Sequence, residues 1–198
     1  MSGDVERCYA SALTFEKYRT QLRIHVSAFN EHYERLAFVL DEERGKAPVG
    51  NSRILILTEE YCIDSVLNVP LIARLVEASP DAALRITRRD EHLKLAARFP
   101  GRGGASRLPT VIFLGRSRQV LGYWSERAEC AHRWMGSFIA QDPMPELILE
   151  DGQPTPRLTA WMDRRFSSQR VIFEAQGWRS VRDELRALAN SATSGSGC

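Results

Sequence analysis

Long apolar runs are missing from this chain, and cysteine is scarce. None of its 198 residues belongs to a stretch of 18 consecutive apolar residues, so we expect no transmembrane helix. The first residues lack an apolar segment behind a basic start, so no secretory signal is expected either. The four cysteines lie far apart, at positions 8, 62, 130 and 198, whereas small secreted folds pair their cysteines densely. These absences predict a cytoplasmic protein in a reducing compartment, with no membrane partner.

An excess of charge of one sign is also missing. Lys and Arg total 27 against 25 Asp and Glu, which leaves a net charge of +2. Such a balance gives no support to binding of nucleic acid or of a membrane surface. The four histidines are scattered, and no Cys/His pair has a matching second pair, so we expect no metal site. Phosphate-binding and serine-nucleophile motifs are absent as well.

The chain instead contains alternating helical and strand patterns. Apolar residues at three- and four-residue steps predict a helix from Thr14 to Asp41, with Thr14 as its N-cap. Short continuous apolar runs predict strands over 53–58, 83–87, 110–114 and 119–123. Further helices are expected over 62–78, 90–99 and 126–141. This order predicts an α/β fold in which helices cover both faces of a mixed sheet.

The composition changes along the chain and suggests its division. We expect a flexible N-terminus over 1–13, a domain with an N-terminal helix over 14–142, a helical C-terminal extension over 143–190 and a flexible tail over 191–198. Large apolar residues in the extension, such as Trp161 and Trp178, require burial. They pack either on the domain or in a partner interface, for which a homodimer through these helices is one possibility.

The residues with chemical potential gather in Thr58-Glu-Glu-Tyr-Cys-Ile-Asp-Ser65, where a predicted strand ends and a helix begins at Cys62. A helix start offers free N–H groups and the positive end of the dipole, which lower a cysteine pKa from ~8.5 toward ~3.5–7.5. Ser65 lies one turn later and can donate a hydrogen bond to the sulfur. The Asp64 carboxylate opposes a thiolate, because it disfavours a second negative charge. The sequence leaves open which effect is larger.

A second segment, Arg107-Leu-Pro-Thr110, places a proline at a strand start, where the peptide bond before it can be cis. Together, the two segments and the order of elements resemble the thioredoxin superfamily. They are most similar to small bacterial thioredoxin family proteins that carry an N-terminal helix and a Thr-Glu-aromatic-Cys-x-Asp-Ser segment. The resemblance covers roughly Phe15 to Gln141. It implies a three-layer thioredoxin-like fold with a sheet of four to five strands, an extra N-terminal helix and a C-terminal helical extension.

The resemblance implies a role for each residue of the site. Cys62 corresponds to the attacking cysteine, and Ser65 stands at the position of the resolving cysteine. Pro109 corresponds to a cis-proline that faces the nucleophile, and the Leu108 backbone would pair with an extended substrate. The other residues expected to bind substrate flank these two segments: Tyr61, Ile63, Asp64 and Arg107.

Three departures from the family pattern limit the chemistry. The second cysteine is missing, Ile63 replaces a small residue, and Ile56 stands where dithiol members often keep a buried acid. Cys62 can then form a mixed disulfide, which another thiol must release. Glutathione, another low-molecular-weight thiol or a partner protein would supply that thiol, and no other cofactor is expected. Cys8, Cys130 and Cys198 are interpreted as bystanders, although a distant cysteine of the chain would also serve.

These residues favour a monothiol thiol–disulfide oxidoreductase or thiol-transfer protein. Its substrate would be a disulfide or thiol, carried by a protein or a small molecule. The alternative is a non-catalytic adaptor with the same fold, which would hold a partner in the groove beside Pro109 or on its C-terminal helices.

Overall fold

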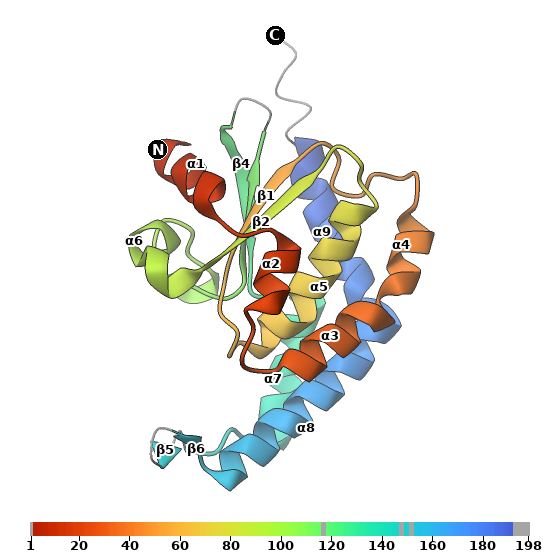
Figure 1. Ribbon diagram of the computed structural model, residues 1–198. Coiled ribbons are helices and arrows are strands. Elements are labelled where there is room, and N and C mark those ends of the chain that lie inside the picture. The colour runs from red at the N-terminus through yellow and green to blue at the C-terminus, as the bar shows by residue number, and fades with distance from the viewer. Residues whose placement is uncertain (1, 116–117, 147–148, 151–152, 192–198) are drawn as a thin grey trace. The chain divides into compact units, whose positions relative to one another are not determined.

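A computed structural model describes residues 2–115, 118–146, 149–150 and 153–191 (Figure 1). Its main sheet has four strands in the order β2-β1-β3-β4. The parallel pair is β1 with β2, while β1 with β3 and β3 with β4 are antiparallel. The strands are β1 (Arg53–Thr58), β2 (Ala83–Arg88), β3 (Thr110–Leu114) and β4 (Val120–Ser125). The predicted mixed sheet is confirmed.

The chain divides into two compact units, Met1–Arg127 with Val181–Cys198, and Ala128–Ser180. The helices of the first unit are α1 (Ser2–Ser11), α2 (Phe15–Thr20), α3 (Val26–Arg35), α4 (Ala37–Glu43), α5 (Ile63–Glu77), η1 (Arg89–His92), α6 (Leu93–Ala96) and η2 (Arg102–Gly104), followed by most of α9 (Trp178–Ser191). The second unit holds α7 (Glu129–Gln141), β5 (Leu149–Glu150), β6 (Gln153–Pro154), α8 (Pro156–Ile172) and the π-helical turn η3 (Phe173–Gly177).

Helices cover both faces of the central strand β1. Leu55 and Leu57 pack in one cluster with Cys8 of α1 and Leu95 of α6. Because side chains alternate along a strand, Ile54 and Ile56 point to the opposite face, toward α5. Strand β1 is buried on both faces, which explains its continuous apolar sequence. This layered arrangement places the start of α5 directly after the end of β1.

The helix predicted over 14–41 is three separate helices, so that prediction is wrong in its continuity. Thr14 does cap α2, since its hydroxyl accepts a hydrogen bond from the Lys17 amide at 3.3 Å. The break follows at Ile24 and His25, where His25 adopts a left-handed φ of 56°. The Ile24 amide donates to the Glu60 carboxylate at 3.0 Å instead of continuing a helix. A distant acidic side chain therefore stabilises the break.

The N-terminus also differs from expectation, because residues expected to be flexible form helix α1. Val5 is completely buried and Cys8 is 5% exposed. Both pack against apolar residues of β1 and α6. The spacing of Val5, Cys8, Tyr9 and Ala12 is a helical pattern that sequence reasoning could have used.

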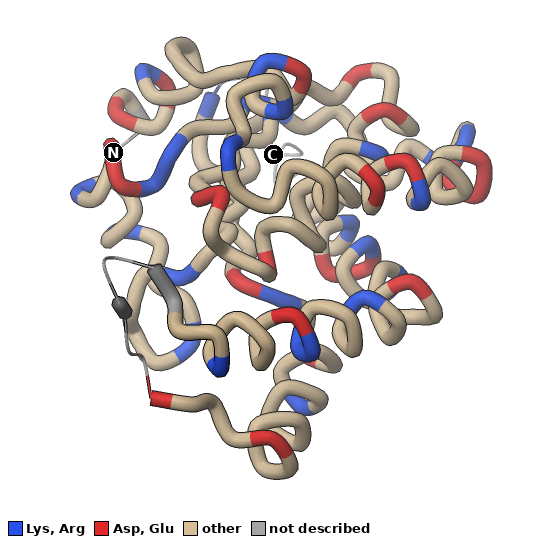
Figure 2. Tube along the Cα trace, turned by 60° about the horizontal axis from the view of Figure 1, so that its bottom comes forward, with Lys and Arg blue, Asp and Glu red and all other residues tan. Residues whose placement is uncertain are grey.

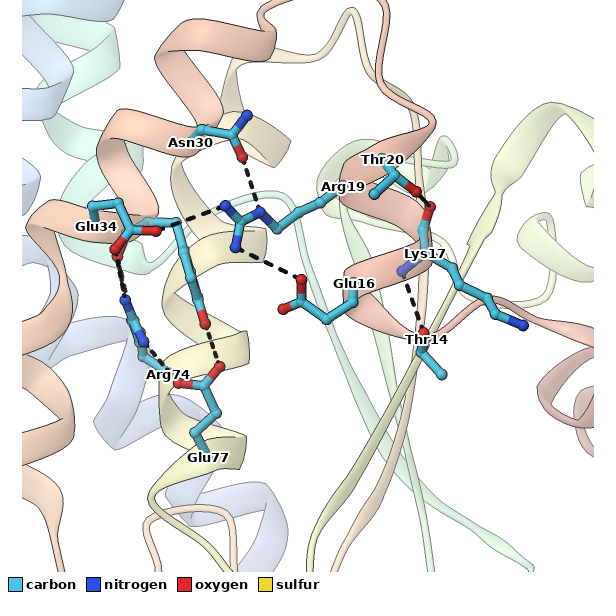
Figure 3. A network of polar contacts seen from close by, with 10 residues as sticks. Thr14, Glu16, Lys17, Arg19, Thr20, Asn30, Glu34, Arg74 and Glu77 are labelled. Carbon is cyan, nitrogen blue, oxygen red and sulfur yellow. Dashed lines mark hydrogen bonds and ion pairs between the residues drawn. The ribbon is translucent and has the colours of Figure 1, made fainter.

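A network of polar contacts ties the N-terminal helices to α5 (Figure 3). Arg19 of α2 donates to Asn30 at 2.9 Å and lies 3.7 Å from Glu34 of α3. Glu34 also lies 3.7 Å from Arg74 of α5. The Arg74 guanidinium stacks 3.6 Å from the centre of the Tyr33 ring, which adds a cation–π contact. These contacts connect α2 and α3 to α5, the helix whose N-cap is Cys62.

The second unit contains an aromatic cluster. The Trp134 and Phe138 rings stack at 5.1 Å, and the Trp161 ring lies 5.9 Å from Phe138. Trp161 is buried, and its indole N–H donates to the Asp142 carbonyl at 2.9 Å. The burial that the sequence required for Trp161 is thus achieved within the chain.

Two further expectations concern the distribution of charge and the absence of a transmembrane helix. Blue and red positions are interspersed along the trace in Figure 2. Within the described ranges, no helix is long and apolar enough to cross a membrane. Of the tail expected over 191–198, Ser191 ends α9, and residues 192–198 with Cys198 lie outside the described residues.

Candidate functional site at Cys62

Cys62 occupies the N-cap position of α5. A tight turn precedes it, closed by the Cys62 amide, which donates to the Glu59 carbonyl at 3.2 Å. The Cys62 carbonyl accepts the first helical hydrogen bond, from Val66 at 3.0 Å. The side chain is half-buried, and its Sγ lies 3.6 Å from the Leu108 carbonyl oxygen. The fold therefore brings together the two segments singled out in the sequence.

The segment opposite the sulfur is held from both ends. The Leu108–Pro109 peptide bond is cis, and Pro109 is buried while Leu108 is half-buried. The Pro109 carbonyl accepts from the Glu126 amide at 2.8 Å. The Thr110 hydroxyl donates to the Arg107 carbonyl at 2.7 Å. Arg107 itself is exposed, so its side chain is free to meet a ligand from solvent.

Glu60, two residues before Cys62, anchors the loop to the N-terminal helices and to β2. Its buried carboxylate accepts backbone hydrogen bonds from Arg23 and Ile24 and lies 3.0 Å from the Arg88 guanidinium. Burial alone would raise the pKa of Glu60, but these hydrogen bonds and the Arg88 charge hold it below its usual value. Glu60 is therefore a charged anchor of the loop that carries Cys62.

Glu59 and Tyr61 attach the same loop to the segment after β2. The Glu59 carboxylate accepts from the Asp90 amide at 2.8 Å, and burial raises the pKa of Glu59. Arg89 donates to the Tyr61 hydroxyl at 2.8 Å, while the Tyr61 ring remains 46% exposed. The sequence singled out Tyr61 but not Glu59 or Glu60. Two adjacent acids that directly follow an apolar strand were the signal in the sequence that could have indicated Glu59 and Glu60.

The first turn of α5 is also held by charge. Asp64 forms a two-point ion pair with Arg127, at 2.6 and 3.1 Å. Their side chains are only 5% and 11% exposed. Ile63 is equally buried, at 5%. The side chains of Ile63 and Asp64 thus offer little surface to a substrate, unlike the role expected for them. Arg127 was not recognised, because nothing near it in the sequence marks it as a partner of Asp64.

The structure decides the balance of effects on the thiol. Burial raises the pKa of Cys62, and the Asp64 carboxylate raises it further. The Ser65 hydroxyl and the backbone amides of Ser65 and Asp64 lower it, but not enough to compensate. The Ser65 oxygen is buried and, in the described part of the chain, has no hydrogen-bond partner of normal length. Cys62 therefore rests as a protonated thiol at neutral pH, contrary to the lowered pKa that a helix start favours.

Cys8 is a poor candidate for a second thiol. Burial and the nearby Glu91 raise the pKa of Cys8 to about 11. Cys8 lines a cavity of about 770 Å³ between α1 and the η1–α6 segment, and Cys62 does not line that cavity. Cys130 belongs to the second unit and carries a free thiol. Among the residues that the structure describes, no group of three or more metal-binding side chains is brought together.

A protein-family model described as thioredoxin matches residues 12–163, which is more than half of the chain. The chain belongs to the thioredoxin family. The predicted superfamily and the α/β fold class, with its helical C-terminal extension, are confirmed.

Two solved structures are similar to this thioredoxin-family chain. One is the crystal structure of a protein of unknown function from Pseudomonas aeruginosa, with a TM-score of 0.52, 14% identity, and coverage of 84% of this chain and 95% of that one. The other is an HIV epitope scaffold, with a TM-score of 0.54, 16% identity, and coverage of 86% and 97%. No curated protein matches. At these identities the likeness concerns the fold alone.

A glycine beside the site provides a test of how tightly the Arg107 segment is packed. A Cβ at Gly101 would lie 2.4 Å from Arg107 Cγ and 2.8 Å from Arg107 Cβ and Ser125 Oγ. We expect Gly101→Ala to lower the free energy of unfolding by about 1–3 kcal/mol, because the Arg107 backbone must move. Gly3→Ala is the control, since its nearest neighbour is the end of the Arg7 side chain at 3.6 Å. Equal thermal unfolding midpoints for the two variants would contradict this prediction.

Proposed function

We propose that this thioredoxin-family protein is a thiol–disulfide oxidoreductase or thiol-transfer protein that acts through Cys62 alone. The observation that carries the proposal is the contact of Cys62 Sγ with the Leu108 carbonyl oxygen at 3.6 Å, beside cis-Pro109. A half-buried sulfur next to a backbone segment suits attack on a disulfide in an extended chain that pairs with that segment. Tyr61 and Arg107, both exposed, stand on the surface around it.

The proposed reaction has two exchange steps. The Cys62 thiol loses its proton to solvent, and the thiolate attacks one sulfur of a disulfide. A new S–S bond joins Cys62 to that sulfur, the substrate S–S bond breaks, and the leaving thiolate takes up a proton. A second thiol then loses its proton, and its thiolate attacks the substrate sulfur of the mixed disulfide; a new S–S bond joins these two sulfurs, the bond to Cys62 breaks, and the Cys62 thiolate takes up a proton. Glutathione, another low-molecular-weight thiol or a partner protein provides this second thiol in a reducing compartment such as the cytoplasm.

The raised pKa of Cys62 predicts the pH dependence of the first step. Below its pKa, the thiolate fraction grows tenfold for each pH unit. We expect the rate of mixed-disulfide formation with a disulfide-bonded peptide to rise about tenfold per pH unit through neutral pH, with no plateau until the pH exceeds the ordinary cysteine value. Quenched samples analysed by peptide mass spectrometry distinguish Cys62 from Cys130 in the same reaction. A plateau near pH 7 would show that the pKa is lowered and that burial does not dominate.

The same raised pKa favours a second candidate, a non-catalytic adaptor that binds a peptide at the Leu108–Pro109 segment. An adaptor would bind the extended peptide without forming a mixed disulfide at any pH. Binding measured by calorimetry alongside the exchange assay separates the two functions. Persistent binding without exchange would contradict the oxidoreductase proposal and support the adaptor.

A further inference from the structure

A buried ion pair joins the two halves of the Cys62 site. Asp64 lies in the first turn of α5, two residues after Cys62, and Arg127 follows strand β4, 63 residues later. Arg127 donates from Nε to Asp64 Oδ1 at 3.1 Å and from Nη2 to Asp64 Oδ2 at 2.6 Å. Two parallel hydrogen bonds between a guanidinium and a carboxylate fix both distance and orientation.

Backbone contacts extend this ion pair to the segment that faces the sulfur. Asn68, one turn after Asp64, donates to the Asp64 carbonyl at 2.8 Å and to the Glu126 carbonyl at 3.3 Å. The Glu126 amide donates to the Pro109 carbonyl at 2.8 Å. The Ser125–Arg127 segment therefore connects the first turn of α5 to Pro109, the residue that follows the carbonyl contacted by Cys62.

We propose that Arg127 is a positioning residue for the Cys62 thiol. Its two-point ion pair with Asp64 holds the first turn of α5 against the Pro109 segment. The same ion pair places a positive charge on the Asp64 carboxylate, which is two residues from Cys62. The contribution of Arg127 to catalysis rests on the function proposed above. The effect of Arg127 on the pKa of the Cys62 thiol does not depend on that function.

The carboxylates around the site are held by different partners. In the loop before Cys62, Glu60 is held by Arg88 and by backbone amides, and Glu59 by the Asp90 amide. In the segment after β4, the Glu126 carboxylate also accepts from Arg127, at 2.7 Å. Loss of the guanidinium would leave two carboxylates, Asp64 and Glu126, without this cation beside the α5 start.

The segments packed near Cys62 carry a few further charges. Asp90 pairs with Arg89 after β2, and Arg107 is exposed in the segment opposite the sulfur. Neither replaces the lost cation, because Arg89 is already paired and Arg107 extends to solvent. The Asp64 carboxylate raises the pKa of Cys62, second only to burial, so removal of the Arg127 charge beside it should strengthen that effect.

The test is the pH midpoint of Cys62 alkylation by iodoacetamide, measured on the full chain by peptide mass spectrometry. Arg127→Met should raise the midpoint by about one pH unit or more, because Asp64 loses its opposite charge. Asp64→Asn should lower the midpoint. The midpoint of the double variant Asp64→Asn/Arg127→Met should be lower than that of Arg127→Met. Arg127→Lys keeps the charge and should lie between the wild type and Arg127→Met.

Arg182→Met is the matched control. It removes a guanidinium 2.8 Å from another buried carboxylate, Glu43, in the same unit, and should leave the Cys62 midpoint unchanged. An unchanged midpoint in Arg127→Met would overturn the proposal. A shift equal to that of Arg182→Met would also overturn it, because it would show a purely structural role.

The two proposals fail separately in this design. If the midpoints shift as expected but neither the wild type nor any variant forms a mixed disulfide with a peptide, Arg127 is a positioning residue and the oxidoreductase function is wrong. If exchange occurs but the midpoints do not shift, the function stands and the role of Arg127 is wrong.

Discussion

Replacing Cys62 with serine is expected to abolish mixed-disulfide formation completely. In the proposed reaction the Cys62 sulfur forms the new S–S bond, and a serine hydroxyl cannot form one. Serine is close to cysteine in size, and Cys62 is half-buried at a helix N-cap, where serine is favourable. Loss of exchange in Cys62→Ser should therefore not result from unfolding. The measurement is exchange with a disulfide-bonded peptide in the presence of reduced glutathione.

Cys130→Ser is the control for Cys62→Ser. Cys130 is also half-buried and carries a free thiol, but it lies in the second unit. We expect Cys130→Ser to exchange at the wild-type rate. Retained exchange in Cys62→Ser, or its loss in Cys130→Ser alone, would show that the reactive thiol is elsewhere. Ser65→Ala should retain exchange at a lower rate, because loss of the hydroxyl removes an effect that lowers the pKa of Cys62.

The largest expected effect on stability is at Glu43, whose side chain is completely buried at the end of α4. Its carboxylate oxygens lie 2.8 Å from Arg182 and 2.6 Å from Arg186, both in α9. Glu43→Ala would leave two largely buried guanidinium groups without this partner. Breaking a buried ion pair by removing one partner costs about 3–5 kcal/mol, and we expect a loss of this size in the free energy of unfolding.

Denaturant unfolding followed by tryptophan fluorescence measures this loss, since Trp124 is buried and donates to Glu184 of α9 at 2.7 Å. Asp41→Ala is the control in the same helix, because its pair with Arg44 is exposed and should contribute less than about 1 kcal/mol. Adding Arg182→Met to Glu43→Ala should recover part of the loss, because one of the two guanidinium groups that lost the Glu43 carboxylate is then removed. Equal stabilities of Glu43→Ala and Asp41→Ala would show that α9 is not held through Glu43.

Local sequence information is sufficient for the elements that depend on neighbouring residues. The apolar run 53–58 predicted β1, and Thr14 predicted the N-cap of α2. The cysteine and proline segments were sufficient to indicate the thioredoxin family. Each of these features depends on periodicity or on capping within a few residues, which the sequence shows directly.

Contacts between distant segments account for the features that the sequence left open or concealed. The break before α3 depends on Glu60, which lies 36 residues from Ile24 in the sequence. The N-terminal residues form helix α1 because they are buried against α6 and β1. Arg127 is a partner of Asp64 because strand β4, which precedes it, places it beside α5 in the folded chain. The pKa of Cys62 depends on burial and on the Asp64 charge, which outweigh the helix start. Burial and ion pairing arise from packing, so residues far apart in the chain determined whether this cysteine rests as a thiol.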